Sequence, residues 1–143
     1  MNILKKIYDY YLKKTNPVRY AKKIGVKMGT NIHLYGNITW GSEPWLISLG
    51  TNVYITDGCK FINHDGGPLI LRKKIPDLEL TFPITIKDDV YIGMNTLILP
   101  GVTIGNNCIV RAGSIVTKDV SDNSVVAGVP ARFIKTTDQY LEK

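Results

Sequence analysis

The chain has 143 residues, of which 44% are hydrophobic and 21% are charged, a balance typical of one folded domain and unlike that of a disordered segment. It has no apolar run of the roughly 18 residues that a membrane span requires, and no apolar signal-peptide core at its N-terminus. Its two cysteines, Cys59 and Cys108, are too few for a disulfide framework and have no neighbours at zinc-ligand spacing, so we expect a single cytoplasmic domain without a metal.

The formal net charge of +6 is confined to the N-terminal fifth of the chain. Residues 1–30 hold eight basic residues and one acidic residue, Asp9, whereas residues 31–143 hold ten basic and eleven acidic residues. A local basic surface of this kind differs from a basic domain. We therefore expect no nucleic-acid partner.

Residues 1–27 predict two short helices that form an N-terminal cap. An apolar stripe recurs at helical spacing with lysines opposite it, and its members are Ile3, Leu4, Ile7, Tyr8, Tyr11 and Leu12. Asn16 and Pro17 suit the N-cap and first residue of the second helix, and Gly25 suits its end. Two interpretations stay open, a cap over the end of a repeat and a basic amphipathic surface that touches an anionic membrane.

A six-residue repeat occupies the rest of the chain, from about residue 28 to residue 136. Large apolar residues recur every six positions in three blocks: Met28, Leu34, Trp40; Leu49, Ile55, Phe61; and Ile86, Ile92, Ile98, Ile104, Val110, Val116. Four positions after most of them stands a β-branched or small residue, and both cysteines fall in this class. We expect both positions to face a core and both cysteines to be buried.

The third position after each apolar residue predicts a corner. It is held by residues that tolerate the left-handed backbone region: Asn31, Asn37, Asn52, Gly58, Asp89, Asn95, Gly101, Asn107, Gly113 and Asp119. A corner every six residues favours an all-β solenoid of three short parallel strands per turn, with 18 residues per turn and about four coils.

These repeats resemble the hexapeptide-repeat acyltransferases, and most closely the bacterial sugar and capsular-polysaccharide O-acetyltransferases. The similarity is carried by residues 92–97 (IGMNTL), 98–103 (ILPGVT), 104–109 (IGNNCI) and 110–115 (VRAGSI). The resemblance implies a left-handed parallel β-helix, a homotrimer, and acetyl-CoA as the acyl donor. The left hand comes from the resemblance alone, because ordinary parallel crossovers are right-handed.

The repeat is broken at two places. Three extra residues enter around residues 41–45 (GSEPW), where Glu43 reads as a solvated side chain of a small bulging loop. His64 closes the last regular hexad and is followed by an excursion over about residues 65–83, which carries apolar residues that an isolated loop does not need. We expect this long loop to protrude and to pack on a neighbouring subunit.

The resemblance implies that His64 is the general base of a direct transfer from acetyl-CoA to an acceptor hydroxyl. It places the oxyanion donor at the backbone of Met94, beside Gly93. Asn63 and Asp65 flank the base and are candidates for orienting it or holding the acceptor. Tyr91 occupies a slot where the family often carries an aromatic residue that lines the acceptor site, while His33, in a regular outward slot, reads as a solvated side chain.

The C-terminal part of the repeat is similar to the CoA-binding end of the family. CoA needs small residues beside a groove and cations near its phosphates. The resemblance assigns this role to Gly93, Met94, Ala112, Gly113, Thr117, Lys118, Arg132 and Lys135. Residues 137–143 read as a C-terminal tail.

We therefore expect a carbohydrate O-acetyltransferase of capsular, exopolysaccharide or lipopolysaccharide biosynthesis. N-acetylation of an amino sugar or acetylation of an antibiotic is the alternative within the same fold. A metal-dependent hydratase on a similar solenoid would need three histidine ligands, and the chain has two histidines. A non-catalytic scaffold would leave His64 and the C-terminal cations without a purpose.

Overall fold

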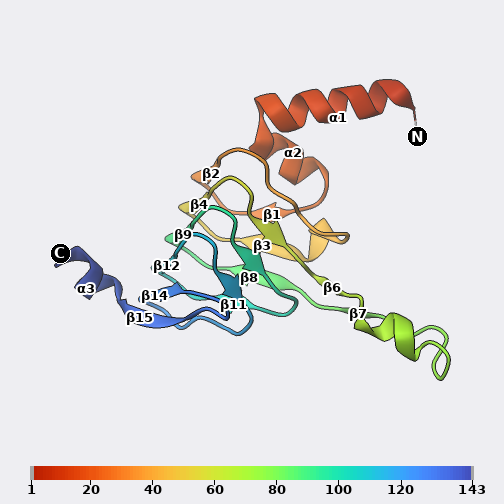
Figure 1. The fold of residues 1–143 in the computed structure, drawn as a ribbon. Helices are drawn as coiled ribbons and strands as arrows, with labels where there is room; N and C mark the ends of the chain where they lie inside the picture. Colours follow the sequence, from red (N-terminus) through yellow and green to blue (C-terminus); the bar gives the residue numbers. More distant parts are fainter. Residues whose placement is uncertain (1, 143) are drawn as a thin grey trace.

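The structure, a computed structural model, describes residues 2–142 and shows a coil of short strands stacked into three sheets (Figure 1). Sheet A contains β1 (Lys27–Met28), β3 (Ile47–Leu49), β8 (Ile84–Ile86) and β11 (Thr103–Ile104). Sheet B contains β2 (Ile32–Leu34), β4 (Val53–Ile55), β9 (Val90–Ile92), β12 (Cys108–Val110), β14 (Ser124–Ala127) and β15 (Arg132–Thr136). Sheet C contains β5 (Lys60–Phe61), β10 (Leu97–Ile98) and β13 (Ile115–Val116).

The chain visits the three sheets in a fixed order, from A to B to C and back to A. Parallel pairs join Ile86 to Ile104, Cys108 to Val90, and Leu97 to Ile115. Each pair is 18 residues apart, which confirms the predicted turn of three hexads. We call the corner between sheets B and C the B–C edge and the corner between sheets C and A the C–A edge.

Two insertions at the C–A edge lengthen this spacing. Met28 pairs with Leu49, 21 residues on, because three extra residues enter before β3, where the 3₁₀ helix η1 (Pro44–Leu46) lies. Leu49 pairs with Ile86, 37 residues on, because the chain leaves the stack after β5 and returns at β8.

The predicted inward positions form one continuous core. Eleven of the twelve large apolar residues of the hexads are buried, as are both cysteines. Met28 and Ile32, in the first coil, are only partly buried but pack against this core. The burial of stacked aliphatic side chains is the main stabilising term of the solenoid.

The predicted corners are confirmed at most positions. Positive φ angles occur at Asn31, Asn52, Asp89, Asn95 and Asn107, and at Gly58, Gly101 and Gly113. The prediction is wrong for Asn37 and Asp119. At the first of these corners Gly36 takes the positive φ, and Asp119 instead accepts a hydrogen bond from the Thr103 N–H through Oδ1.

Helices and a hairpin lie at the two ends of the stack. Helix α1 (Ile3–Thr15) precedes α2 (Pro17–Lys23), whose N-cap Asn16 accepts a hydrogen bond from the Arg19 N–H, as the sequence predicts. At the other end β15 folds back antiparallel on β14 and leads into α3 (Thr137–Leu141). Among residues 2–142, no helix has the length and apolarity to cross a bilayer.

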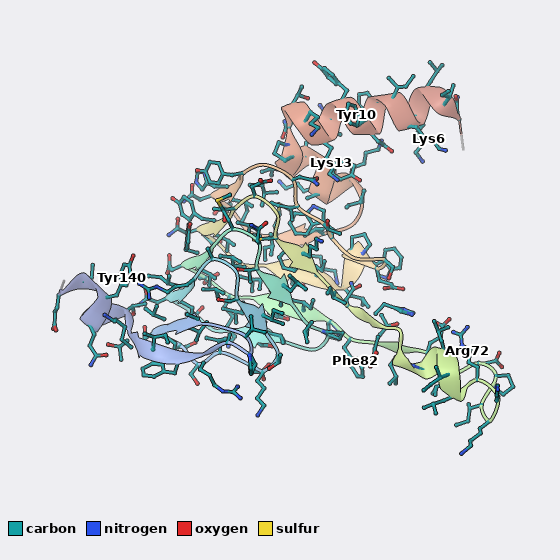
Figure 2. All side chains as sticks on the ribbon, in the orientation of Figure 1. Lys6, Tyr10, Lys13, Arg72, Phe82 and Tyr140 are labelled. Carbon is teal, nitrogen blue, oxygen red and sulfur yellow. The ribbon has the colours of Figure 1, made fainter. Side chains whose placement is uncertain are left out.

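Residues 65–83 form an arm that projects from the C–A edge (Figure 1). Strands β6 (His64–Asp65) and β7 (Leu80–Thr81) pair antiparallel at its root, and the 3₁₀ helix η2 (Gly67–Leu71) follows β6. Figure 2 places Arg72 in the far part of the arm and Phe82 near its root.

Candidate active site

His64 lies at the root of the arm, where the chain leaves sheet C. Strand β6 fixes its backbone by pairing His64 with Thr81. Its side chain is one-third exposed, so the ring is anchored by the protein and still reachable by a substrate. His64 Nδ1 lies 3.4 Å from the Thr81 hydroxyl.

The prediction of a solvated side chain was wrong for Glu43. The structure places its Oε1 3.5 Å from His64 Nδ1, and its side chain is 23% exposed rather than fully solvated. Ser42 Oγ donates a hydrogen bond to Glu43 Oε2 at 2.5 Å. A carboxylate beside Nδ1 favours the tautomer with hydrogen on Nδ1, which leaves Nε2 free to accept a proton.

Asn63 holds Glu43 in this position. Its buried side chain donates from Nδ2 to the Glu43 carbonyl at 2.5 Å and accepts at Oδ1 from the Glu43 N–H at 3.4 Å. Asn63 therefore stabilises the loop that carries the carboxylate. Because both ends of its amide bond to the Glu43 backbone, Asn63 contributes to the site by positioning Glu43.

Asp65 makes a local contact within the arm. Its Oδ1 accepts a hydrogen bond from the Gly67 N–H at 2.8 Å, so it organises the turn that follows β6. The contact with Nδ1 that Asp65 was a candidate to make belongs to Glu43. Asp65 still lines the cavity beside His64.

Two cavities meet at His64. The larger, of about 420 Å³, is walled mainly by apolar side chains and includes Ile62, Phe82, Leu99, Pro100 and Thr117. The smaller, of about 160 Å³, includes Thr39, Ser42, Lys60 and Asn63 among its lining residues. His64 therefore lines both cavities.

The larger cavity leads along the C–A edge toward the predicted cations. Strands β5, β10 and β13 stack in register, so Thr117 lies two coils beyond His64, or roughly 10 Å at the spacing of parallel strands. Thr117 is followed by Lys118, which with Arg132 lines a further cavity of about 430 Å³ at the C-terminal end of the stack. Lys135 lies in β15, opposite Val125.

The remaining predicted residues lie on other parts of the solenoid. Gly93 and Met94 follow β9, and Ala112 and Gly113 follow β12, so all four lie on the B–C edge. A Cβ at Gly93 would come within 2.5 Å of the Ala112 backbone nitrogen, which requires glycine there. Tyr91 projects from sheet B into a separate cavity that it shares with Tyr54. One chain therefore does not bring Met94 or Tyr91 to His64.

Met94 nevertheless offers a donor. Its side chain is 48% exposed, and its N–H makes no hydrogen bond within the part of the chain that the structure describes. The Met94 carbonyl accepts from the Gly113 N–H in the next coil, which fixes the orientation of this corner. A free, rigid N–H is the kind of group that stabilises a developing oxyanion.

The two cysteines do not form a nucleophile. Burial raises the pKa of the Cys59 and Cys108 thiols above the ordinary value, so the reactive thiolate is disfavoured. Residues 2–142 contain no group of three or more His, Cys, Asp or Glu side chains placed to hold a metal ion. The geometry around His64 suits general-base chemistry on a substrate that spans two cavities.

Comparison with known proteins finds relatives of this chain. Residues 83–118 match the family model described as bacterial transferase hexapeptide (six repeats). The chain is 45% identical over 142 residues to Protein CapG of Staphylococcus aureus, and this match covers 98% of the chain and 83% of CapG. It is also 37% identical over 119 residues to galactoside O-acetyltransferase of Escherichia coli K12, covering 83% of the chain. The chain spans only 58% of that longer relative.

Solved structures of similar proteins include one with coenzyme A bound. A galactoside acetyltransferase in complex with coenzyme A superposes with a TM-score of 0.65 at 27% identity, over 98% of this chain and 82% of that one. That complex carries CoA on a fold similar to the one described above.

Proposed function

Because the chain belongs to the bacterial hexapeptide-repeat acyltransferases, we propose that it is an acetyl-CoA-dependent O-acetyltransferase that acts on a hydroxyl group of a carbohydrate. The observation that carries the proposal is the His64 ring, with Nδ1 against Glu43 and with two cavities beside it. The similarity to galactoside O-acetyltransferase supports the reaction class and a sugar acceptor.

The residues divide the chemistry among them. Acetyl-CoA supplies an activated acyl carbon, the carbonyl of its thioester. His64 Nε2 takes the proton from the acceptor hydroxyl as its oxygen attacks this carbon, and His64 then returns the proton to the leaving sulfur. Glu43 stabilises the imidazolium that exists between these two events. A backbone N–H at the position of Met94 stabilises the charge that develops on the carbonyl oxygen.

The larger cavity and the C-terminal cations fit the donor. Ile62, Leu99 and Pro100 offer an apolar wall for a thin, uncharged arm, and a cavity of about 420 Å³ is within the range of small-molecule sites. Lys118 and Arg132 line the cavity beyond Thr117 and supply positive charge for the phosphates of CoA. Lys135 extends this basic surface.

The smaller cavity fits the acceptor. Ser42 and Lys60 line the smaller cavity beside His64 and offer hydroxyl and ammonium groups to the hydroxyls of a sugar. Its size suits one sugar ring and leaves the rest of a glycan outside. We propose that the acceptor is a carbohydrate of capsular, exopolysaccharide or lipopolysaccharide biosynthesis.

The site is completed by a second chain. His64 lies at the C–A edge, whereas Met94, Tyr91, Ala112 and Gly113 lie at or beside the B–C edge, so a rotationally symmetric trimer would bring the two edges of neighbouring chains together. The arm supports this proposal, because it exposes apolar side chains such as Leu69 and Ile70.

The proposal includes the architecture that this family implies. The strands of residues 28–136 form about four left-handed coils, with residues 1–27 as an N-terminal unit, residues 65–83 as the protruding loop, and residues 137–143 as a tail. We place the reaction in the cytoplasm, where both free cysteines remain reduced.

The direct test is acceptor-dependent release of CoA. The purified protein, acetyl-CoA and a panel of oligosaccharides are mixed, free thiol is followed with time, and the product is examined by mass spectrometry for an added acetyl ester. We expect His64→Ala to lower kcat by at least about 10³-fold while light scattering shows the same trimer. Full activity in this variant would exclude His64 as the base, and transfer to amino groups alone would make the enzyme an N-acetyltransferase.

A further inference from the structure

The two N-terminal helices differ in what they cover. On α2, Ala21 is fully buried, and Val18 and Ile24 pack against the core of the first coil. On α1, Leu12 is the one buried residue of the whole helix. Helix α2 therefore closes the end of the stack, and α1 is not needed for that purpose.

Helix α1 exposes a continuous apolar face. Ile3, Leu4, Ile7 and Tyr11 are between 58% and 70% exposed, and their spacing places them on one side of the helix. Figure 1 shows α1 lying beyond α2, on the side away from the sheets. Four large apolar side chains in water are costly unless another surface covers them.

The lysines of the same helix have few partners of opposite charge. Lys5, Lys6, Lys13 and Lys14 all lie on α1, and Figure 2 shows Lys6 and Lys13 beside Tyr10 on this helix. Asp9 is the only acidic residue among residues 1–30, and it is already paired with Lys23. Lys14 lies 5.7 Å from the centre of the Tyr10 ring, a cation–π contact that leaves its charge in place.

The arm differs from α1 in the charges that surround its exposed apolar residues. It also exposes apolar residues, with Ile70 81% exposed, but its three cations are accompanied by Asp77 and Glu79. Arg72 and Glu79 form an ion pair at 3.3 Å within the arm. A nearly neutral apolar surface suits another protein chain, whereas two copies of the lysine-rich α1 would repel each other.

We propose that α1 docks the enzyme on an anionic lipid bilayer. The helix lies in the plane of the interface, with Ile3, Leu4, Ile7 and Tyr11 below the headgroups and the lysines near the phosphates. Any rotationally symmetric trimer places its three α1 helices at the same height along its axis. Three weakly bound helices then act together through their high effective concentration.

Vesicle flotation of the full-length protein, with no substrate present, tests this proposal separately from catalysis. Vesicles of phosphatidylcholine with about one-third phosphatidylglycerol should carry the protein to the top of the gradient, and pure phosphatidylcholine or 0.5 M salt should reduce the bound fraction at least tenfold. Failure to float on the anionic vesicles would overturn the proposal and leave the acetyltransferase assignment untouched.

Matched variants separate the helix from a general effect. Leu4→Glu should reduce binding at least tenfold, whereas Leu141→Glu changes a leucine of α3 that is 82% exposed and should not. Lys5→Glu with Lys6→Glu should also abolish binding, and negative charge in the first turn does not disfavour the helix. Lys73→Glu with Lys74→Glu makes the same change of charge in the arm and should bind as the original chain does, once light scattering has shown that it keeps its oligomeric state.

Two further outcomes would overturn the proposal. If Leu4→Glu lowered the molecular mass of the assembly, the apolar face would be covered by a second copy of the chain. If all four variants bound anionic vesicles equally, membrane contact would be made elsewhere.

Discussion

The two edges of sheet C carry different kinds of functional group. The C–A edge is interrupted twice, by the insertion that holds Glu43 and by the arm that begins at His64, and it presents ionisable side chains that face each other at 3.5 Å. At the B–C edge no insertion interrupts the hexads between β4 and β13, and there Gly93 and Met94 present backbone groups and an uncharged side chain beside the charged residues Asp57 and Arg111 of the same edge.

This difference follows from the demands of a hexapeptide corner. A regular corner needs a residue that tolerates positive φ, and Gly58, Asn95 and Gly113 meet this need on the B–C edge. An inserted segment is free of this demand, so it can carry glutamate or histidine; Glu43 has a φ of −121°. Side-chain chemistry in such a solenoid is therefore found where the repeat breaks, and backbone donors are found where it continues.

The largest effect among the tests of this comparison is expected for Glu43→Gln. Glutamine keeps the size of the side chain but removes the charge that stabilises the His64 imidazolium, so kcat should fall by about 10- to 100-fold. KM for acetyl-CoA should stay within about twofold, because Glu43 does not line the donor channel. Stopped-flow or steady-state CoA release measures both constants.

Asp65→Asn is the control for Glu43→Gln. It makes the same chemical change next to His64, but Asp65 bonds to the Gly67 N–H, which an asparagine oxygen can still accept. We expect less than about threefold loss of kcat, within the range of a small structural change. Equal losses in the two variants would contradict the assignment of Glu43 as the positioning residue.

A second test compares one glycine from each edge. Gly41 has a φ of +73°, and a Cβ there would lie 2.6 Å from Asn63 Oδ1, whereas Gly113 has a φ of +72° and a Cβ there would meet no atom within 4 Å. Gly113→Ala should therefore lower the free energy of unfolding by only about 1 kcal/mol, the cost of placing alanine in the left-handed backbone region. Gly41→Ala should lower the free energy of unfolding by about 2 kcal/mol or more, because the Asn63 side chain that bonds to the Glu43 backbone must also move.

Urea unfolding of both variants, followed by circular dichroism, measures this difference. Gly41→Ala should in addition lower kcat, since Asn63 holds Glu43. Equal stability losses would mean that the insertion is no more tightly packed than a regular corner.

A third test concerns the outer end of the C–A edge. Lys118→Ala should raise KM for acetyl-CoA about 10-fold, the loss expected from one charge-assisted contact to a phosphate, with kcat almost unchanged. Lys87→Ala removes an exposed lysine after β8, at the other side of sheet A, and should leave KM unchanged. A fall in kcat with constant KM would place Lys118 nearer to the reacting atoms than we propose.

Much of the fold could be predicted because the hexads repeat one physical requirement. The stacking of Ile86 on Ile104 and the burial of Cys59 and Cys108 follow from period and residue size alone. The sequence also singled out His64 as a candidate, because it stands at a break in the repeat.

The contact between Glu43 and His64 was not predicted, although both residues were recognised as departures from the repeat. The first insertion makes residues 21 apart neighbours in adjacent coils, as Met28 and Leu49 show. Glu43 and His64 have that same separation. The signal was therefore present, but a loop residue gives no periodic indication of where its side chain points. The buried Asn63 amide that turns Glu43 inward could only be seen in three dimensions.

The smallest effect is expected at the regular edge, for Met94→Ala. If the B–C edge contributes only a backbone N–H, removing the Met94 side chain leaves the donor in place, and kcat should change by less than about twofold. The substitution should also be tolerated by the fold, since the side chain is 48% exposed and its carbonyl keeps the bond to the Gly113 N–H. The kcat of CoA release under saturating substrates is the measurement. A loss as large as that of Glu43→Gln would show that the Met94 side chain itself takes part, and the contrast between an edge of side chains and an edge of backbone groups would then fail.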